Sequence, residues 1–343
     1  MTIPTRPQGR WRCGIATLTE TPIPQVAIRA GAWEALGFDD IWVPDERLTR
    51  NVYITLATVA QATSQVGLGP AVTNPYTRHP AITAAAIATV DEISGGRASL
   101  AFGAGGGLDV YGLERTRPAA TLKEAVRVVQ GLTAGERLTY QGEVFSLHDA
   151  GLDFQPVRPV PVYLAGRGPR LLETAGEVAD GAIIGGFATA AGLGYALERI
   201  DQGVQQAGRA TRPDVMAWLY LSVHDDATAA RVAVSHMVLA SLITSRPILD
   251  RLGLRLPARL KDHLDATGWR YPTETPAQAA ELLPDELVEA FAVYGTPADC
   301  LGRLDAIGQL GLNHVAFVPF PAGEDTLDQA ARRAAALLTD LQH

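Results

Sequence analysis

Apolar and polar positions follow a repeating order along the chain: a short apolar strand, a polar or glycine-rich loop, and an amphipathic helix. The order is clearest where a strand predicted at 66–72 runs into Thr-Asn-Pro and a second at 98–102 runs into Gly-Ala-Gly-Gly-Gly. Between them, residues 81–93 are strong helix formers with apolar residues at three-to-four spacing, and Ser-Gly-Gly ends the helix. A strand, a crossover helix and a second strand form the basic unit of a parallel sheet.

The same order recurs on both sides of this segment. Further strands are predicted at 12–18, 38–43, 161–165, 180–184, 215–223 and 313–318. Together these make about eight strand-then-helix units, and no G-x-G-x-x-G fingerprint follows the first strand. A closed α/β barrel, the (β/α)8 TIM barrel, is therefore favoured over a doubly wound sheet.

Two stretches interrupt the order. Residues 138–160 alternate between apolar and polar and contain glycines and prolines, which predicts an excursion with a small hairpin. Residues 225–293 are mostly helical with several prolines, too long for one helix-to-strand step. We expect this second insertion to lie over the carboxyl face of the barrel and to shape or cover its pocket. With both insertions, residues 1–343 are expected to form a single TIM-barrel domain.

Composition narrows the function classes. A chain of 343 residues with 47% hydrophobic composition can bury a large core. The sequence has no uninterrupted run of about 18 apolar residues and no apolar signal core at its start, so we expect a cytoplasmic protein with no membrane partner. A net charge of -8 argues against nucleic acid as a partner. The two cysteines, Cys13 and Cys300, lie in no metal-binding spacing, and no metal is predicted.

Candidate chemistry lies where the predicted strands end, because ligands bind at the carboxyl ends of parallel strands. Asp45 follows the second strand, Thr-Asn-Pro the third, and the glycine run 103–107 the fourth. Glycines let a flat ring or a phosphate approach main-chain N–H groups. Each loop alone is also consistent with an ordinary turn, and Asp45 with a helix cap. Several such loops on one face favour a binding site.

Three motifs carry a family resemblance: Thr-Asn-Pro-Tyr-Thr-Arg-His-Pro-Ala at 73–81, Asp-Glu-Ile-Ser-Gly-Gly-Arg at 91–97, and Gly-Ala-Gly at 103–105. The chain resembles the luciferase-like flavin and deazaflavin oxidoreductases. Within them it is most similar to the coenzyme F420-dependent branch that includes methylenetetrahydromethanopterin reductases. The resemblance covers nearly the whole chain and implies a barrel of the bacterial-luciferase type, a homodimer, and a deazaflavin or flavin at the carboxyl face.

The resemblance also implies a cofactor site. A non-proline cis peptide at Ala71-Val72 would back the ring, Asp45 would contact the ring region, and Thr73 and Gly105 would donate or accept hydrogen bonds. The segment 165–168 would bind the phosphate, with Gly185-Gly186 as a second candidate. The cofactor-binding residues expected in this way are Asp45, Ala71, Val72, Thr73, Ala104, Gly105, Ala165, Gly166, Arg167, Gly168, Gly185 and Gly186.

The chain departs from the family pattern at three positions. Gly106 stands where F420-dependent members often have an acid, and Ala16 where methylenetetrahydromethanopterin reductases have a glutamate. Glu46 stands where sugar-phosphate and alcohol dehydrogenases have a histidine. These departures count against the pterin and also against the sugar-phosphate and alcohol substrates.

The sequence therefore predicts an F420-dependent oxidoreductase that transfers a hydride between C5 of the deazaflavin and a small organic substrate. Glu46 is the expected proton-transfer residue and His79 the second candidate, although Glu46 also fits a solvated loop acid and His79 a helix cap. Two alternatives stay open. The first is an FMN-dependent luciferase-like monooxygenase, and the second is a barrel relative that binds a ligand without catalysis. The substrate and the direction of transfer are not defined by the sequence.

Overall fold

The computed structural model describes residues 11–16 and 21–341, which pack as two compact units. The first unit contains 14–183 and 199–216, apart from the undescribed residues 17–20, and the second contains 11–13, 184–198 and 217–341. Three strands contribute residues to both units, namely β1 (Arg12–Ala16), β8 (Gly181–Gly185) and β9 (Asp214–Val223). The expectation of a single domain stays a prediction.

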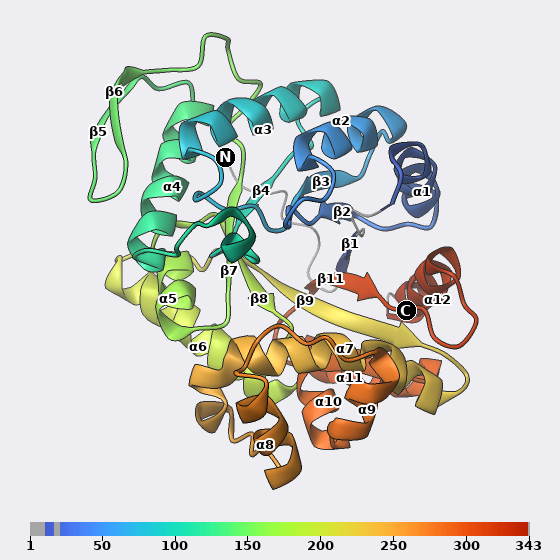
Figure 1. Ribbon diagram of the computed structural model, residues 1–343. Coiled ribbons are helices and arrows are strands. Elements are labelled where there is room, and N and C mark those ends of the chain that lie inside the picture. Colours follow the sequence, from blue (N-terminus) through green and yellow to red (C-terminus); the bar gives the residue numbers. More distant parts are fainter. Residues whose placement is uncertain (1–10, 17–20, 342–343) are drawn as a thin grey trace. The chain divides into compact units, whose positions relative to one another are not determined.

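Short, buried, parallel strands form the core of the first unit (Figure 1). They are β2 (Asp40–Val43), β3 (Gly67–Pro70), β4 (Leu100–Phe102) and β7 (Val162–Gly166), beside the ends of β1 and β8. β1 pairs with β2, β2 with β3, and β4 with β7, all in parallel. An isolated bridge between Leu68 and Ala98 connects β3 to the start of β4. Because both faces are covered, these strands read as continuous apolar runs.

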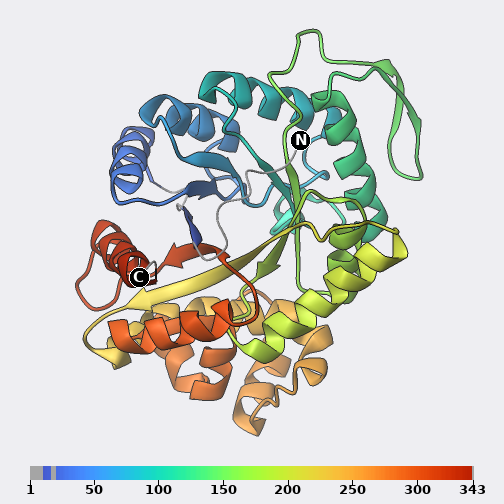
Figure 2. The same cartoon turned by 180° about the vertical axis from the view of Figure 1, so that it is seen from behind.

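Helices cover the strands of the first unit, as Figures 1 and 2 both show. They are α1 (Ile23–Ala35), α2 (Val52–Ala62), α3 (Pro80–Ser94), α4 (Pro118–Thr133) and α5 (Pro169–Val178), each packed on the next. Local signals define their ends: the Asn51 side chain accepts from the N–H groups of Tyr53 and Ile54, and Gly95 ends α3 in the left-handed conformation at φ 68°.

The motif at 91–97 has a structural role. The guanidinium of Arg97 donates to the carbonyl oxygens of Ala60, Val66 and Ser94 at 2.9, 2.6 and 2.8 Å. From α1, the Glu34 carboxylate accepts from the main-chain N–H groups of residues 64–66 at 2.6–3.1 Å. These two side chains fix the segment that leads from α2 into β3.

The predicted hairpin is present: β5 (Leu138–Gln141) and β6 (Ser146–Ala150) pair antiparallel and project beyond α4 (Figure 1). A carboxylate on α4 holds its turn, because Glu124 accepts from the N–H groups of Glu143, Val144 and Phe145 at 2.7, 3.1 and 2.9 Å. Gly142 is required there, since a Cβ at this position would lie 2.3 Å from Oε2 of Glu124.

In the second unit, helices surround the rest of β9, β10 (Ala292–Gly295) and β11 (His314–Pro319). They are α7 (Ala227–Ser245), α8 (Ala258–Ala266), α9 (Pro276–Leu282), α10 (Asp285–Phe291), α11 (Pro297–Gly308) and α12 (Leu327–Leu341), and α6 (Ala190–Gln206) begins in this unit. The predicted helical character of 225–293 is correct except at its end. Residues 292–295 form a strand parallel to β9, which the sequence does not reveal because no turn residue separates it from α10.

One helical segment, Ala227–Ile248, is long and apolar enough to cross a membrane, with a mean hydropathy of 1.4. Polar residues such as Arg231, Ser235 and His236 interrupt its apolar positions, so it contains no uninterrupted run of about 18 apolar residues. Within the unit, α7 packs against α9, α10 and β10, and its Val234, Val238 and Leu242 are completely buried. These contacts are those of a core helix.

Candidate functional site

Asp45 and Thr73, which the sequence places after β2 and β3, are in direct contact. The Thr73 hydroxyl donates to Oδ2 of Asp45 at 2.6 Å. Thr73 is fully buried, and its main chain is held by Ala101 and Gly103, because its N–H donates to the Ala101 oxygen and its oxygen accepts from the Gly103 N–H. The carboxyl ends of β2, β3 and β4 therefore meet at this pair.

The peptide bond between Ala71 and Val72 is cis, as the resemblance implies. Val72 packs directly against the start of the glycine run, since a Cβ built on Gly103 would lie 2.5 Å from Cγ2 of Val72. Only glycine fits at position 103 without displacing this bulge.

Arg78 and Tyr53 complete the surroundings of Asp45. Nη1 of Arg78 lies 3.5 Å from Oδ2 of Asp45, and its guanidinium carbon lies 4.7 Å from the ring centre of Tyr53 on α2. Burial raises the pKa of Tyr53 to about 12, with Arg78 lowering it and Asp45 raising it, so the phenol stays protonated at neutral pH. Neither residue is a predicted site residue, although Arg78 lies inside the motif 73–81.

The glycine run presents main-chain donors. Nε of Arg115 donates to the Ala104 oxygen at 2.7 Å, and Nη2 of Arg115 donates to the Gly105 oxygen. Because C=O and N–H point in opposite directions across a trans peptide, the N–H groups of Gly105 and Gly106 are directed away from Arg115. A Cβ at Gly106 would meet nothing within 4 Å, so the main chain is open there. Arg115 is a third site residue, after Arg78 and Tyr53, that no sequence motif indicates.

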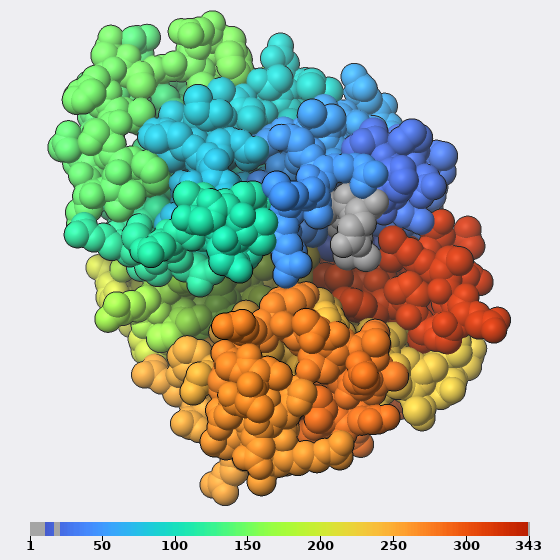
Figure 3. Space-filling view, in the orientation of Figure 1, coloured from blue at the N-terminus to red at the C-terminus, as the bar shows by residue number. Residues whose placement is uncertain are grey.

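The loop after β2 also contacts the segment around η1 (Leu108–Tyr111). The Tyr111 hydroxyl donates to the Arg47 oxygen, and a Cβ on Gly107 would lie 2.9 Å from Cγ of Arg47. On the face shown in Figure 3, the blue loop after β2 and the teal η1 segment meet at the surface. Leu48 and Val110 leave apolar side chains exposed here, at 80% and 53%.

The two predicted proton-transfer residues differ in their surroundings. Glu46 follows Asp45 directly and is exposed. His79 caps α3, because its Nδ1 accepts from the Ala81 N–H at 3.2 Å, and its ring lies edge-on to Phe145 at 5.2 Å. The described contacts of His79 are thus with the start of α3 and the hairpin. Both catalytic assignments stay predictions.

The predicted phosphate segment runs from the end of β7 into α5. Ala165 and Gly166 end the strand, Arg167 follows, and Gly168 caps the helix without any side-chain hydrogen bond. A Cβ at Gly168 would meet nothing within 4 Å. An open helix N-terminus of this kind favours an anion.

Gly185 and Gly186 belong to the second unit. The N–H of Gly186 donates to the Trp218 oxygen at 2.9 Å, so that donor is already used in main-chain pairing. A phosphate role for these two glycines stays a prediction.

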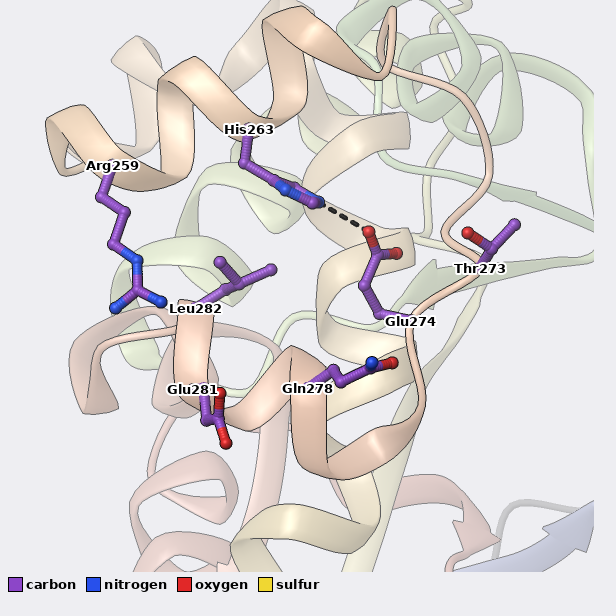
Figure 4. A pocket seen from close by; sticks show the side chains of 7 residues that line it. All are labelled: Arg259, His263, Thr273, Glu274, Gln278, Glu281 and Leu282. Atoms are coloured by element: carbon purple, nitrogen blue, oxygen red, sulfur yellow. Dashed lines mark hydrogen bonds and ion pairs between the residues drawn. The ribbon is translucent and has the colours of Figure 1, made fainter.

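A cavity of about 480 Å³ in the second unit lies apart from all these residues along the chain (Figure 4). Its lining residues come from α8, α9 and the segment before α9, and Nε2 of His263 contacts Oε1 of Glu274 there at 2.6 Å. None of the residues predicted for the cofactor lines it. We therefore assign the candidate site to the loops around Asp45 and not to this cavity.

Comparisons with known proteins show the family to which the chain belongs. The family model described as luciferase-like monooxygenase matches residues 10–314. The chain is 34% identical over 307 residues to the 5,10-methylenetetrahydromethanopterin reductase of Methanolobus tindarius, an alignment that covers 88% of this chain and 92% of that protein. It is 28% identical over 307 residues to the F420-dependent glucose-6-phosphate dehydrogenase of Intrasporangium calvum, covering 82% and 84%.

A solved structure gives the same result. The coenzyme F420-dependent tetrahydromethanopterin reductase of Methanopyrus kandleri superposes with a TM-score of 0.82 at 26% identity, covering 95% of this chain and 97% of that one. The expected α/β fold of the TIM-barrel type and the resemblance to F420-dependent enzymes are both confirmed. The chain therefore belongs to the luciferase-like family, in its branch of F420-dependent oxidoreductases.

Proposed function

We propose that this protein binds coenzyme F420 and transfers a hydride between C5 of the deazaflavin ring and a small organic substrate. The observation that carries the proposal is the meeting of Asp45, Thr73 and the Ala71-Val72 bulge at the strand ends, beside the open glycine run. The bound cofactor supplies the hydride chemistry, and the protein's task is to position two partners and manage one proton.

The residues present fit such a cofactor. A flat ring with polar edges needs an acceptor, main-chain donors and an approach free of side chains. Asp45 offers a carboxylate, Gly105 and Gly106 offer N–H groups, and no atom outside the immediate chain lies within 4 Å of a Cβ at Gly106. The uncapped start of α5 at Gly168 offers donors for a phosphate.

Glu46 is our proposal for proton transfer to or from the substrate, because it is exposed directly beside Asp45. His79 is the second candidate. Its Nδ1 already accepts a main-chain hydrogen bond, so its Nε2 carries the hydrogen and only that atom is free to donate.

The substrate is proposed to be a small organic molecule other than the pterin of the Methanolobus tindarius relative. Ala16 ends β1, pairs with Trp42 and is almost completely buried, so this strand supplies no carboxylate. Gly106 likewise supplies none from the glycine run. The exposed Leu48 and Val110 favour a substrate with an apolar part.

The test is a turnover assay in which oxidised or reduced F420 is mixed with the protein and a panel of small hydride donors and acceptors, while absorption of the deazaflavin is followed. Turnover that Glu46→Gln slows without weakening cofactor binding supports the proposal. Cofactor binding without turnover on any compound of the panel favours the non-catalytic reading. Oxygen consumption with FMN favours the monooxygenase.

We also infer that the protein is a cytoplasmic homodimer without a nucleic-acid or membrane partner. The net charge of -8 supports the absence of a nucleic-acid partner. Ile28, Ile54 and Ile82 support the dimer, because they lie on the successive helices α1, α2 and α3 and leave 72%, 64% and 60% of their surface exposed.

A further inference from the structure

The two oxygens of the Asp45 carboxylate are used differently. Oδ2 accepts from the Thr73 hydroxyl at 2.6 Å and lies 3.5 Å from Nη1 of Arg78. No hydrogen bond to Oδ1 is found among the residues that the structure describes. The side chains of Asp45 and Arg78 are only 21% and 24% exposed, so solvent has limited access to the pair.

Arg78 contacts Asp45 and the ring of Tyr53. Its guanidinium rests on the Tyr53 ring at 4.7 Å, and Asp45 is its ionic partner within the described part of the chain. Nη1 is buried and forms no hydrogen bond with a protein atom there. Burying a guanidinium with so few hydrogen bonds is costly, and the nearby carboxylate and aromatic face are what offset that cost.

Arg97, in the same unit, differs from Arg78 because its role is structural. Its guanidinium donates to main-chain carbonyl oxygens at residues 60, 63, 66 and 94 and so connects α2, α3 and β3. Arg78 has no such set of carbonyl partners among the described residues. Arg78 therefore orients the Asp45 carboxylate and does not connect helices and strands as Arg97 does.

We propose that Arg78, resting on Tyr53, is a positioning residue for Asp45. Together with Thr73 it holds Oδ2 and leaves Oδ1 as the acceptor for a donor group of the cofactor ring. A carboxylate whose rotamer is fixed before the ligand arrives loses less conformational entropy on binding. The inference rests on the proposed function, because it assigns the free oxygen to F420.

A double-mutant cycle on F420 binding tests it, with dissociation constants measured by fluorescence titration. Arg78→Met and Asp45→Asn are each expected to raise the dissociation constant about tenfold or more. If Arg78 acts through Asp45, the double variant binds F420 no more weakly than Asp45→Asn alone. If the increases in the dissociation constant of the two single variants multiply in the double variant, Arg78 acts independently of Asp45. That result would overturn the inference.

Two further variants guard against a folding effect. Arg78→Lys keeps the charge but loses the planar group, so its affinity should fall between those of the wild type and Arg78→Met. If Arg78→Met does not fold, the cycle is run with Arg78→Lys. Arg209→Met is the matched control, because Arg209 donates to the oxygens of Gly176 and Ala179 at 2.8 Å; its melting temperature should fall while F420 affinity is unchanged.

The two proposals fail in different ways. A wild-type protein that does not bind F420 would overturn the proposed function and this inference with it. If the wild-type protein binds F420 but the two single-variant increases in the dissociation constant multiply in the double variant, the proposed function stands. Arg78 would then have no positioning role in it.

Discussion

At the scale of single residues, the candidate site depends on positions with little or no side chain as much as on its charged groups. Gly103 is needed because Val72 packs against it, and Gly105 because its φ is +78°. Gly106 has neither constraint. Its lack of a side chain is therefore unexplained by packing, and access for a ligand is the remaining physical reason.

This distinction gives a prediction for Gly106→Val. The variant should keep the wild-type melting temperature, because its side chain enters open space, and should raise the F420 dissociation constant at least tenfold by blocking the ring. Gly302→Val is the matched control, since a Cβ there also meets nothing within 4 Å. Unchanged F420 affinity in Gly106→Val would contradict the placement of the ring.

Arg115 gives a second prediction at this scale. Arg115→Met removes the donors that hold the Ala104 and Gly105 oxygens, so the N–H groups of the run lose their fixed direction. F420 affinity should fall several-fold, with little change in melting temperature because Arg115 is exposed. Arg115→Lys should retain part of the affinity. Equal affinities in all three proteins would show that the run is rigid without Arg115.

At the scale of elements, buried or half-buried carboxylates join helices to neighbouring main-chain segments. Glu34 on α1 accepts from three successive N–H groups before β3, and Glu124 on α4 does the same in the hairpin. Burial alone would raise the pKa of Glu34, but hydrogen bonds from the N–H groups of Gln65, Val66 and Ser64 lower it overall below its ordinary value.

The pH dependence of Glu34→Gln follows from that direction. A carboxyl whose pKa is lower in the folded state stabilises the fold above its unfolded pKa, near 4.3, and the contribution is lost as pH falls through the folded pKa. Glu34→Gln should therefore melt below the wild type at pH 7, and the gap should narrow below about pH 4. Thermal melting across this range measures it, and a gap independent of pH would contradict the assigned cause.

At the scale of the whole molecule, the exposed isoleucines of α1, α2 and α3 bear on assembly. Ile54→Lys with Ile82→Lys should convert a dimeric wild type into a monomer, because each charge would have to be buried in the interface. Sedimentation equilibrium gives the mass directly. A wild type that sediments near 36.4 kDa would contradict the proposed dimer.

Much of this organisation is visible in the sequence. The eight expected strands are all present among the described residues, because each is an apolar run bounded by glycine, proline or polar residues. Residues 17 and 18 of the first predicted strand lie outside the described residues. The sequence does not predict β10, because Ala292–Gly295 follows the apolar residues of α10 without a turn residue between them. Asp45, Thr73 and the Ala71-Val72 bond follow from the family resemblance. Arg78, Tyr53 and Arg115 do not, because their roles arise from contacts between distant segments that no local pattern encodes.

The central claim is that the loops around Asp45 bind F420. The most direct measurement is a pair of equilibrium titrations of the purified wild-type protein, one with F420 and one with FMN, followed by fluorescence. The account predicts saturable binding of F420 and negligible binding of FMN, with an F420 dissociation constant at least tenfold higher in Gly106→Val. Tight binding of FMN with negligible binding of F420 would contradict it.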